Sequence, residues 1–154
     1  NLTLLDSLNK RINFLNALCE VLEIKSTNIH ARAEEGGRSA ALREQFDVAT
    51  ARAVANLREL AEYCLPFVKC SLTVIKGLTK IKNSLFILST HLYEIGDELD
   101  AAKRAIKELG GKVIDVKKYI LTDDSKRSIV IIKKISQTPA KYPRQSAKIA
   151  KLPL

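Results

Sequence analysis

The chain of 154 residues contains no tryptophan and no methionine, and aromatic residues make up only 5% of it. It has no apolar run near the length of about 20 residues that a membrane-spanning helix requires, so we expect no membrane association. The first residues also lack the charged segment and apolar core of a secretory signal. Because methionine is absent even at residue 1, we expect the sequence to be part of a longer protein.

Cysteine and histidine are also scarce, and their placement limits the chemistry. Cys19, Cys64 and Cys70 include no pair separated by two residues, so reduced, buried thiols in a cytoplasmic protein are the favoured interpretation. His30 and His91 have no second ligand at helical spacing, which predicts no metal site. The sequence has no P-loop, no nucleophile elbow and no dinucleotide-binding glycine motif, so it offers no nucleophile–base pair for covalent catalysis.

The positive charge is concentrated at the C-terminal end. The net charge is +9, and the segment from Lys126 onward holds eight basic residues and no acidic one. The preceding 125 residues are nearly neutral, with 18 basic and 17 acidic residues. A cationic end on a balanced body favours a polyanionic partner such as a nucleic acid. A solvated, poorly ordered tail is the alternative. We expect one domain at residues 1–137 and a basic tail at residues 138–154.

Hydrophobic periodicity predicts alternating strands and helices. Helices, in which apolar side chains recur every three or four positions, are expected at residues 7–22, 56–65 and 97–109. Strands, as short apolar runs between turn residues, are expected at residues 2–6, 27–32, 46–53, 71–76, 112–121 and 128–135. A short turn joins the last two strands, which makes them antiparallel. The fold class is therefore α/β, a doubly wound and mostly parallel sheet with an antiparallel C-terminal strand.

Polar residues follow three of the predicted parallel strands: Asp6-Ser7, residues 32–35 and residues 50–52. The carboxyl ends of parallel strands meet at one edge of a sheet, over the crevice where nucleotides bind. Asp6 can accept hydrogen bonds from both hydroxyls of a ribose. Ser7 is expected to cap the next helix and to leave amide N–H groups beside the crevice. Each of these positions taken alone also fits a solvated loop charge.

Six stretches carry a specific resemblance: LLDSLNKRINFL, RAEE, FDVATARAVANL, EYCLPFVK, KELGGKV and KKISQTPAKYPR. They resemble the bacterial glucose-inhibited division protein B family, also called RsmG, over residues 2–77 and 97–154. The resemblance implies a Rossmann-like class I methyltransferase that uses S-adenosylmethionine to methylate guanine N7 of small-subunit (16S) ribosomal RNA. It also implies a cytoplasmic protein whose partner is ribosomal RNA or the small ribosomal subunit, and we expect a monomer.

The resemblance also assigns roles to individual residues. Cofactor contacts are expected at five of them: Asp6 and Ser7 at the ribose, Ala33 and Glu34 at the adenine, and Arg52 near the cofactor and the target base. RNA contacts are expected at the C-terminal signature, where Tyr142 would stack on a base or ribose while Lys141 and Arg144 hold phosphates. No catalytic residue is identified, because positioning alone is expected to drive the reaction.

Lys10 and Arg11 lie in the first turns of the first predicted helix, where positive charge opposes the helix dipole. That unfavourable placement is consistent with a phosphate of RNA or a carboxylate as partner. Two solvated side chains fit the sequence equally well. Because the basic signature lies far along the chain from the predicted cofactor residues, removing the tail is expected to weaken RNA binding and leave the cofactor site unchanged.

The chain also departs from the family pattern. The N-terminal helical region, the first strand and the glycine-rich cofactor loop are missing, Cys70-Ser71 replaces a Gly-Gly pair, and residues 145–148 replace a glycine-containing run. Residues 78–96 do not match, and SLFILSTHLYEI within them predicts an inserted helix. Two alternatives therefore stay open. One is a cationic RNA-binding module without catalysis. The other is a nicotinamide-dependent oxidoreductase, which the terminal hairpin and the KYPR sequence argue against.

Overall fold

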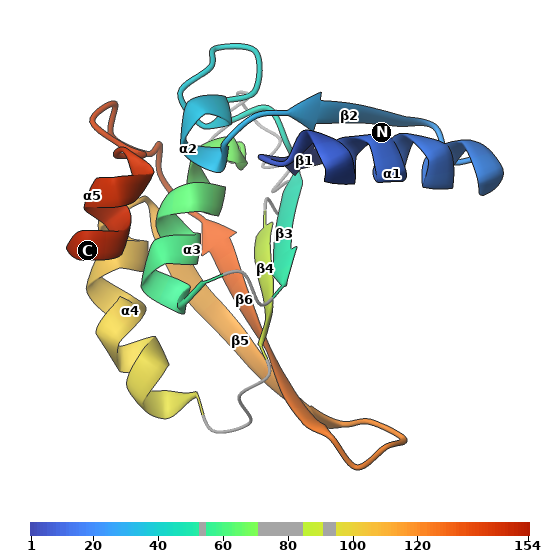
Figure 1. Cartoon of the computed structure of the whole chain (residues 1–154). Helices are drawn as coiled ribbons and strands as arrows, with labels where there is room; N and C mark the ends of the chain where they lie inside the picture. Colours follow the sequence, from blue (N-terminus) through green and yellow to red (C-terminus); the bar gives the residue numbers. More distant parts are fainter. Residues whose placement is uncertain (53–54, 71–84, 91–94) are drawn as a thin grey trace, which may run out of the picture.

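The computed structural model describes residues 1–52, 55–70, 85–90 and 95–154. Within these ranges strands and helices alternate through most of the chain (Figure 1). The strands are β1 (Leu2–Asp6), β2 (Ser26–His30), β3 (Val48–Arg52), β4 (Leu85–Thr90), β5 (Gly111–Ile120) and β6 (Lys126–Lys134). The helices are α1 (Asn9–Val21), α2 (Ala33–Gly36), α3 (Leu57–Cys64), the 3-10 turn η1 (Leu65–Phe67), α4 (Gly96–Glu108) and α5 (Ser146–Lys151).

The strands form two sheets. β1 and β2 pair in parallel, and a four-stranded sheet has the order β3-β4-β6-β5. In the larger sheet β3 and β4 are parallel, whereas β6 runs antiparallel to both β4 and β5. The expected α/β class with an antiparallel C-terminal end is therefore confirmed. The parallel strands were expected to form one sheet. Among the described strands β1 pairs only with β2, so the parallel strands divide into two pairs, β1–β2 and β3–β4.

The prediction of an inserted helix at SLFILSTHLYEI is wrong, because residues 85–90 form β4 at the centre of the larger sheet. Residues 85–88 are a continuous apolar run, which periodicity alone does not distinguish from a buried helix. The strand expected at residues 71–76 lies outside the described residues. The short helix α2, at Ala33–Gly36, was not among the predicted helices.

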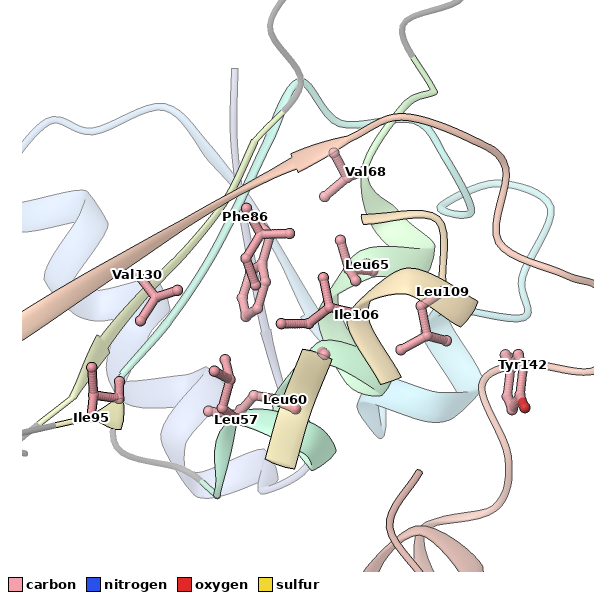
Figure 2. Packing of buried hydrophobic residues seen from close by; sticks show 13 residues of the cluster. Leu57, Leu60, Leu65, Val68, Phe86, Ile95, Ile106, Leu109, Val130 and Tyr142 are labelled. Carbon is pink, nitrogen blue, oxygen red and sulfur yellow. The ribbon is translucent and has the colours of Figure 1, made fainter. Parts of the chain in front are cut away.

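The main hydrophobic core lies between the four-stranded sheet and the helices α3 and α4. Figure 2 shows Leu57 and Leu60 of α3 gathered with Ile106 of α4 and Phe86 of β4, all of them at most 2% exposed. Burial of such a side chain stabilises the fold by about 1.5–3 kcal/mol. This core anchors the helix that follows β3, and that helix forms one wall of the cavity described below.

Two glycines follow α4 and lead into β5. Gly110 has a φ of 83°, in the left-handed region that favours glycine, and a Cβ there would lie 2.2 Å from the carbonyl oxygen of Ser136. A Cβ on Gly111 would lie 2.9 Å from Cγ2 of Ile132. The chain therefore turns sharply from α4 into β5 only because neither residue has a side chain.

The C-terminal segment, residues 138–154, folds back onto the domain. Arg43 donates from Nη2 to the carbonyl oxygen of Thr138 at 2.7 Å and from Nη1 to that of Tyr142 at 2.8 Å. Arg38 donates to the carbonyl of Pro143 at 2.8 Å, and α5 lies beside α3 (Figure 1). The basic segment is thus packed against the body. In the described part of the chain, no helix has the length and apolar character needed to span a membrane.

Candidate functional site

A cavity of about 720 Å³ lies between β1 and β3. Its volume falls within the range of about 300–1,000 Å³ that small-molecule sites occupy. Its walls are mostly apolar and come from the two strands, α3 and the residues around Phe67. Several polar or charged side chains converge on it: Asp6, Arg11, Arg32, Glu34, Glu59 and Tyr63. An apolar chamber with a few convergent polar groups is the usual form of a ligand site.

Asp6 lies at the carboxyl end of β1 and lines this cavity. Its Oδ1 accepts a hydrogen bond from the backbone N of Leu8 at 2.8 Å, and its Oδ2 lies 3.3 Å from Nη1 of Arg11. The expectation that Ser7 caps α1 is wrong, because the helix begins later, with Leu8 as its N-cap and no side-chain cap. The Asp6 side chain instead binds the backbone N–H of Leu8, where the chain enters α1. Arg11, which was expected to contact RNA, has the carboxylate of Asp6 as its partner.

Ala33 and Glu34 open α2 on another wall of the cavity. Glu34 is only 6% exposed, and its Oε1 accepts a hydrogen bond from Nε of Arg32 at 2.7 Å. Burial opposes ionisation of Glu34, but hydrogen bonds from Arg32, from its own backbone and from Ser146 outweigh it and lower the pKa. Arg32 also donates from Nη2 to Oγ of Ser146 at 2.8 Å, which connects the cavity wall to the C-terminal segment.

Two cavity residues of α3 were not predicted from the sequence. Glu59 and Tyr63 lie four positions apart, so that they share one face of the helix, and both line the cavity. Burial, followed by the charges of Glu34 and Glu59, raises the pKa of Tyr63, so its hydroxyl remains a proton donor at neutral pH. No signal in the sequence distinguishes them from other polar residues of a helix face.

Two further predicted residues, Arg52 and Lys10, are placed here by their position along the chain. Arg52 is the last residue of β3, directly after three residues that line the cavity. Lys10 is exposed on α1. The structure therefore brings together Asp6, Ser7, Ala33 and Glu34, whose individual roles stay predictions.

The C-terminal signature has partners inside the protein. The expectation that the Tyr142 ring is presented to RNA is wrong, because the residue is 4% exposed and its hydroxyl donates to Oε1 of Glu108. Arg144 pairs with the buried Glu62 at 2.6 Å instead of facing solvent. Only Lys141, with 66% of its side chain exposed, remains at the surface, 3.0 Å from Glu108. Sequence reasoning missed these acidic partners because they lie on distant helices.

Comparisons with known proteins agree with this architecture. The family described as GidB, rRNA small subunit methyltransferase G, matches residues 1–85. Ribosomal RNA small subunit methyltransferase G of Clostridium botulinum is 40% identical over 156 residues, covering 99% of this chain and 59% of the relative. That of Bacillus licheniformis is 44% identical, covering 100% and 60%. The chain thus spans about 60% of the length of these relatives.

Solved structures resemble the fold at low sequence identity. A SAM-dependent methyltransferase from Methanosarcina mazei superposes with a TM-score of 0.60 and 9% identity, covering 88% of this chain and 82% of the other. An rRNA methylase from Streptococcus thermophilus gives 0.54 and 12%, covering 87% and 73%. These likenesses show a methyltransferase fold.

Proposed function

The chain belongs to the rRNA small subunit methyltransferase G family, and on that premise we propose that it forms part of an S-adenosylmethionine-dependent enzyme. The proposed reaction is methyl transfer to guanine N7 of small-subunit ribosomal RNA. Its setting would be the bacterial cytoplasm, with ribosomal RNA or the small subunit as partner. The observation that carries the proposal is the meeting of the strand-end acid Asp6 with Ala33 and Glu34 around one cavity.

The residues around the cavity fit the cofactor. An ionised carboxylate offers about four acceptor sites, and the backbone N of Leu8 and the guanidinium of Arg11 each take one on Asp6. Acceptor capacity therefore remains for the two hydroxyls of a ribose. Glu34 stays ionised beside Arg32, and the mostly apolar walls suit an adenine ring.

The proposed chemistry needs positioning more than proton transfer. When bound, S-adenosylmethionine supplies an electrophilic methyl group on its sulfonium. The N7 lone pair of guanine is unprotonated at neutral pH, so no general base is required of the chain. Its residues have to hold the base in line and exclude water, and such alignment contributes up to about 7–11 kcal/mol. Because the methylated base gains positive charge, Arg52 suits a positioning or phosphate-binding role better than stabilisation of that charge, which neutral or acidic neighbours would provide.

Calorimetry with S-adenosylhomocysteine tests the proposal on this chain. We expect Asp6→Ala to weaken binding by about 1–3 kcal/mol, the range for hydrogen bonds to a charged group. Asp47→Ala is the matched control, since its side chain is 62% exposed and is not part of the cavity wall. Equal affinity of the Asp6 variant and the parent would remove Asp6 from the ribose role.

Two further measurements separate the proposal from its alternatives. A thermal shift with NAD and none with S-adenosylhomocysteine would contradict the methyltransferase assignment. Binding of ribosomal RNA by a chain that binds neither cofactor would favour an RNA-binding module without catalysis. We expect a shift with S-adenosylhomocysteine alone.

A further inference from the structure

The β5–β6 hairpin projects beyond the carboxyl ends of β3 and β4. Backbone pairing places four residues in one row across the sheet: Arg52, Ser89, Ile129 and Lys117. β3 ends at this row, and β4 ends one residue later. The hairpin continues to Leu121, four residues past Lys117, which at about 3.3 Å per residue is roughly 13 Å. Figure 1 shows this arm extending away from the rest of the molecule on that side.

One face of the arm combines an aromatic ring with two cations. Tyr119 is paired across the strands with Arg127, and Lys117 lies two residues before Tyr119, so all three side chains project from the same face. Tyr119 is 43% exposed and the side chain of Lys117 is 53% exposed. Neither belongs to the hydrophobic core, so both side chains are accessible to a partner.

Two acidic residues of the arm, Asp115 and Asp123, have partners within it. Asp123 accepts hydrogen bonds from the backbone N of Ser125 at 3.0 Å and from its hydroxyl, which closes the turn at the tip. Asp115 lies 3.9 Å from Lys117, a long and exposed pairing that a phosphate can replace. The face around Tyr119 therefore remains suited to an anionic partner.

We propose that this face, defined by Lys117, Tyr119 and Arg127, binds an unpaired segment of the RNA substrate. A base stacks on the Tyr119 ring while the two cations contact the flanking phosphates, which is how single-stranded nucleic acid is held without base-specific contacts. The inference rests on the proposed function, because the arm extends from the sheet edge at which Arg52 lies. RNA bound there passes from the arm toward the target-base site.

Fluorescence anisotropy with a labelled 12-nucleotide single-stranded RNA tests the arm on this chain. We expect Tyr119→Leu to raise Kd about 5- to 100-fold, whereas Tyr119→Phe retains the ring and the parent affinity. The double variant K117Q/R127Q should raise Kd and lower the log–log salt slope by about 1.4. The matched control K103Q/K107Q removes two charges from exposed positions of α4. Its Kd and salt slope should change less than those of K117Q/R127Q.

Three outcomes would overturn the inference. The first is equal RNA affinity of Tyr119→Leu and Tyr119→Phe. The second is a loss of RNA affinity in K103Q/K107Q as large as that in K117Q/R127Q. The third is that Tyr119→Leu weakens binding of duplex RNA of the same length as much as it weakens binding of the single strand. Binding of S-adenosylhomocysteine is measured in every variant and should not change. If the parent binds cofactor and RNA, and the arm variants bind RNA as tightly as the parent, the arm proposal fails and the methyltransferase proposal stands. If the parent binds RNA through the arm but binds no cofactor, the arm proposal stands and the methyltransferase proposal fails.

Discussion

Arg144 and Glu62, 82 residues apart in the sequence, form a bidentate ion pair in which the glutamate side chain is fully buried. Nη2 of Arg144 lies 2.6 Å from Oε2, and its Nε lies 2.9 Å from Oε1. The backbone N of Arg144 donates to the same carboxylate at 2.8 Å. The hydrogen bonds that Arg144 donates to Glu62 raise the pKa of Arg144, which keeps the pair charged. This pair anchors the C-terminal segment to α3.

We expect Arg144→Leu to lower the free energy of unfolding by about 3–5 kcal/mol, because it leaves a buried carboxylate without its cation. Urea denaturation measures the change. Lys141→Gln is the matched control, since its pair with Glu108 is exposed and such pairs contribute about 0.2–1 kcal/mol. Equal midpoints for the two variants would show that the segment is not held by this pair.

The contact between Ser146 and Arg32 predicts coupling between the C-terminal segment and the cavity. Ser146→Ala removes a hydrogen bond from Arg32 and one that lowers the pKa of Glu34. We expect S-adenosylhomocysteine to bind about 2- to 10-fold more weakly, the effect of one hydrogen bond of about 0.5–1.5 kcal/mol. Calorimetry measures this. Ser125→Ala, in the hairpin turn, is the control and should bind like the parent.

This coupling reverses an expectation from the sequence, which placed the tail and the cofactor site apart. Deleting residues 138–154 should now reduce cofactor affinity, because Arg32 and Arg43 both lose partners. Parent-like cofactor affinity in a folded truncated chain would restore the original expectation.

Lys134 predicts an unusual pH dependence of stability. Its side chain is fully buried, and Nζ donates to the carbonyl oxygens of Leu65 at 2.9 Å and Leu109 at 3.2 Å. Burial lowers its pKa to about 8, although Glu44 opposes the shift. Because the unfolded chain holds this proton up to a higher pH, the free energy of unfolding should rise by about 1 kcal/mol between pH 7 and pH 9.

Urea denaturation at several pH values measures that rise as the difference between the parent and Lys134→Met. The difference is needed because burial raises the pKa of Cys64 to about 12, and ionisation of this thiol in the unfolded chain lowers stability near and above pH 9. Identical pH profiles for parent and variant would show that Lys134 is charged equally in both states.

Local signals identified much of the architecture. The apolar spacing of α4 and the glycines after it predicted that helix to within one residue at each end. β4 was mistaken for a helix because its continuous apolar run, residues 85–88, has no alternation to detect. In the site, Asp6 was identified because an acid directly after an apolar run marks a strand end, whereas Glu59 and Tyr63 are ordinary residues on a helix face until the cavity is known.

The sequence by itself determined the alternation of strands and helices, the antiparallel C-terminal pair and the acid at the end of β1, because these depend on periodicity and on neighbours along the chain. Only the tertiary structure decided what the basic C-terminal residues do. A charged side chain in a sequence shows its capacity to pair but not its partner, and the partners of Arg144 and Tyr142 lie 82 and 34 residues away. Burial of the Glu62 carboxylate and of Tyr142 turned an expected RNA surface into the attachment of the C-terminal segment, because a desolvated charge must be paired within the fold.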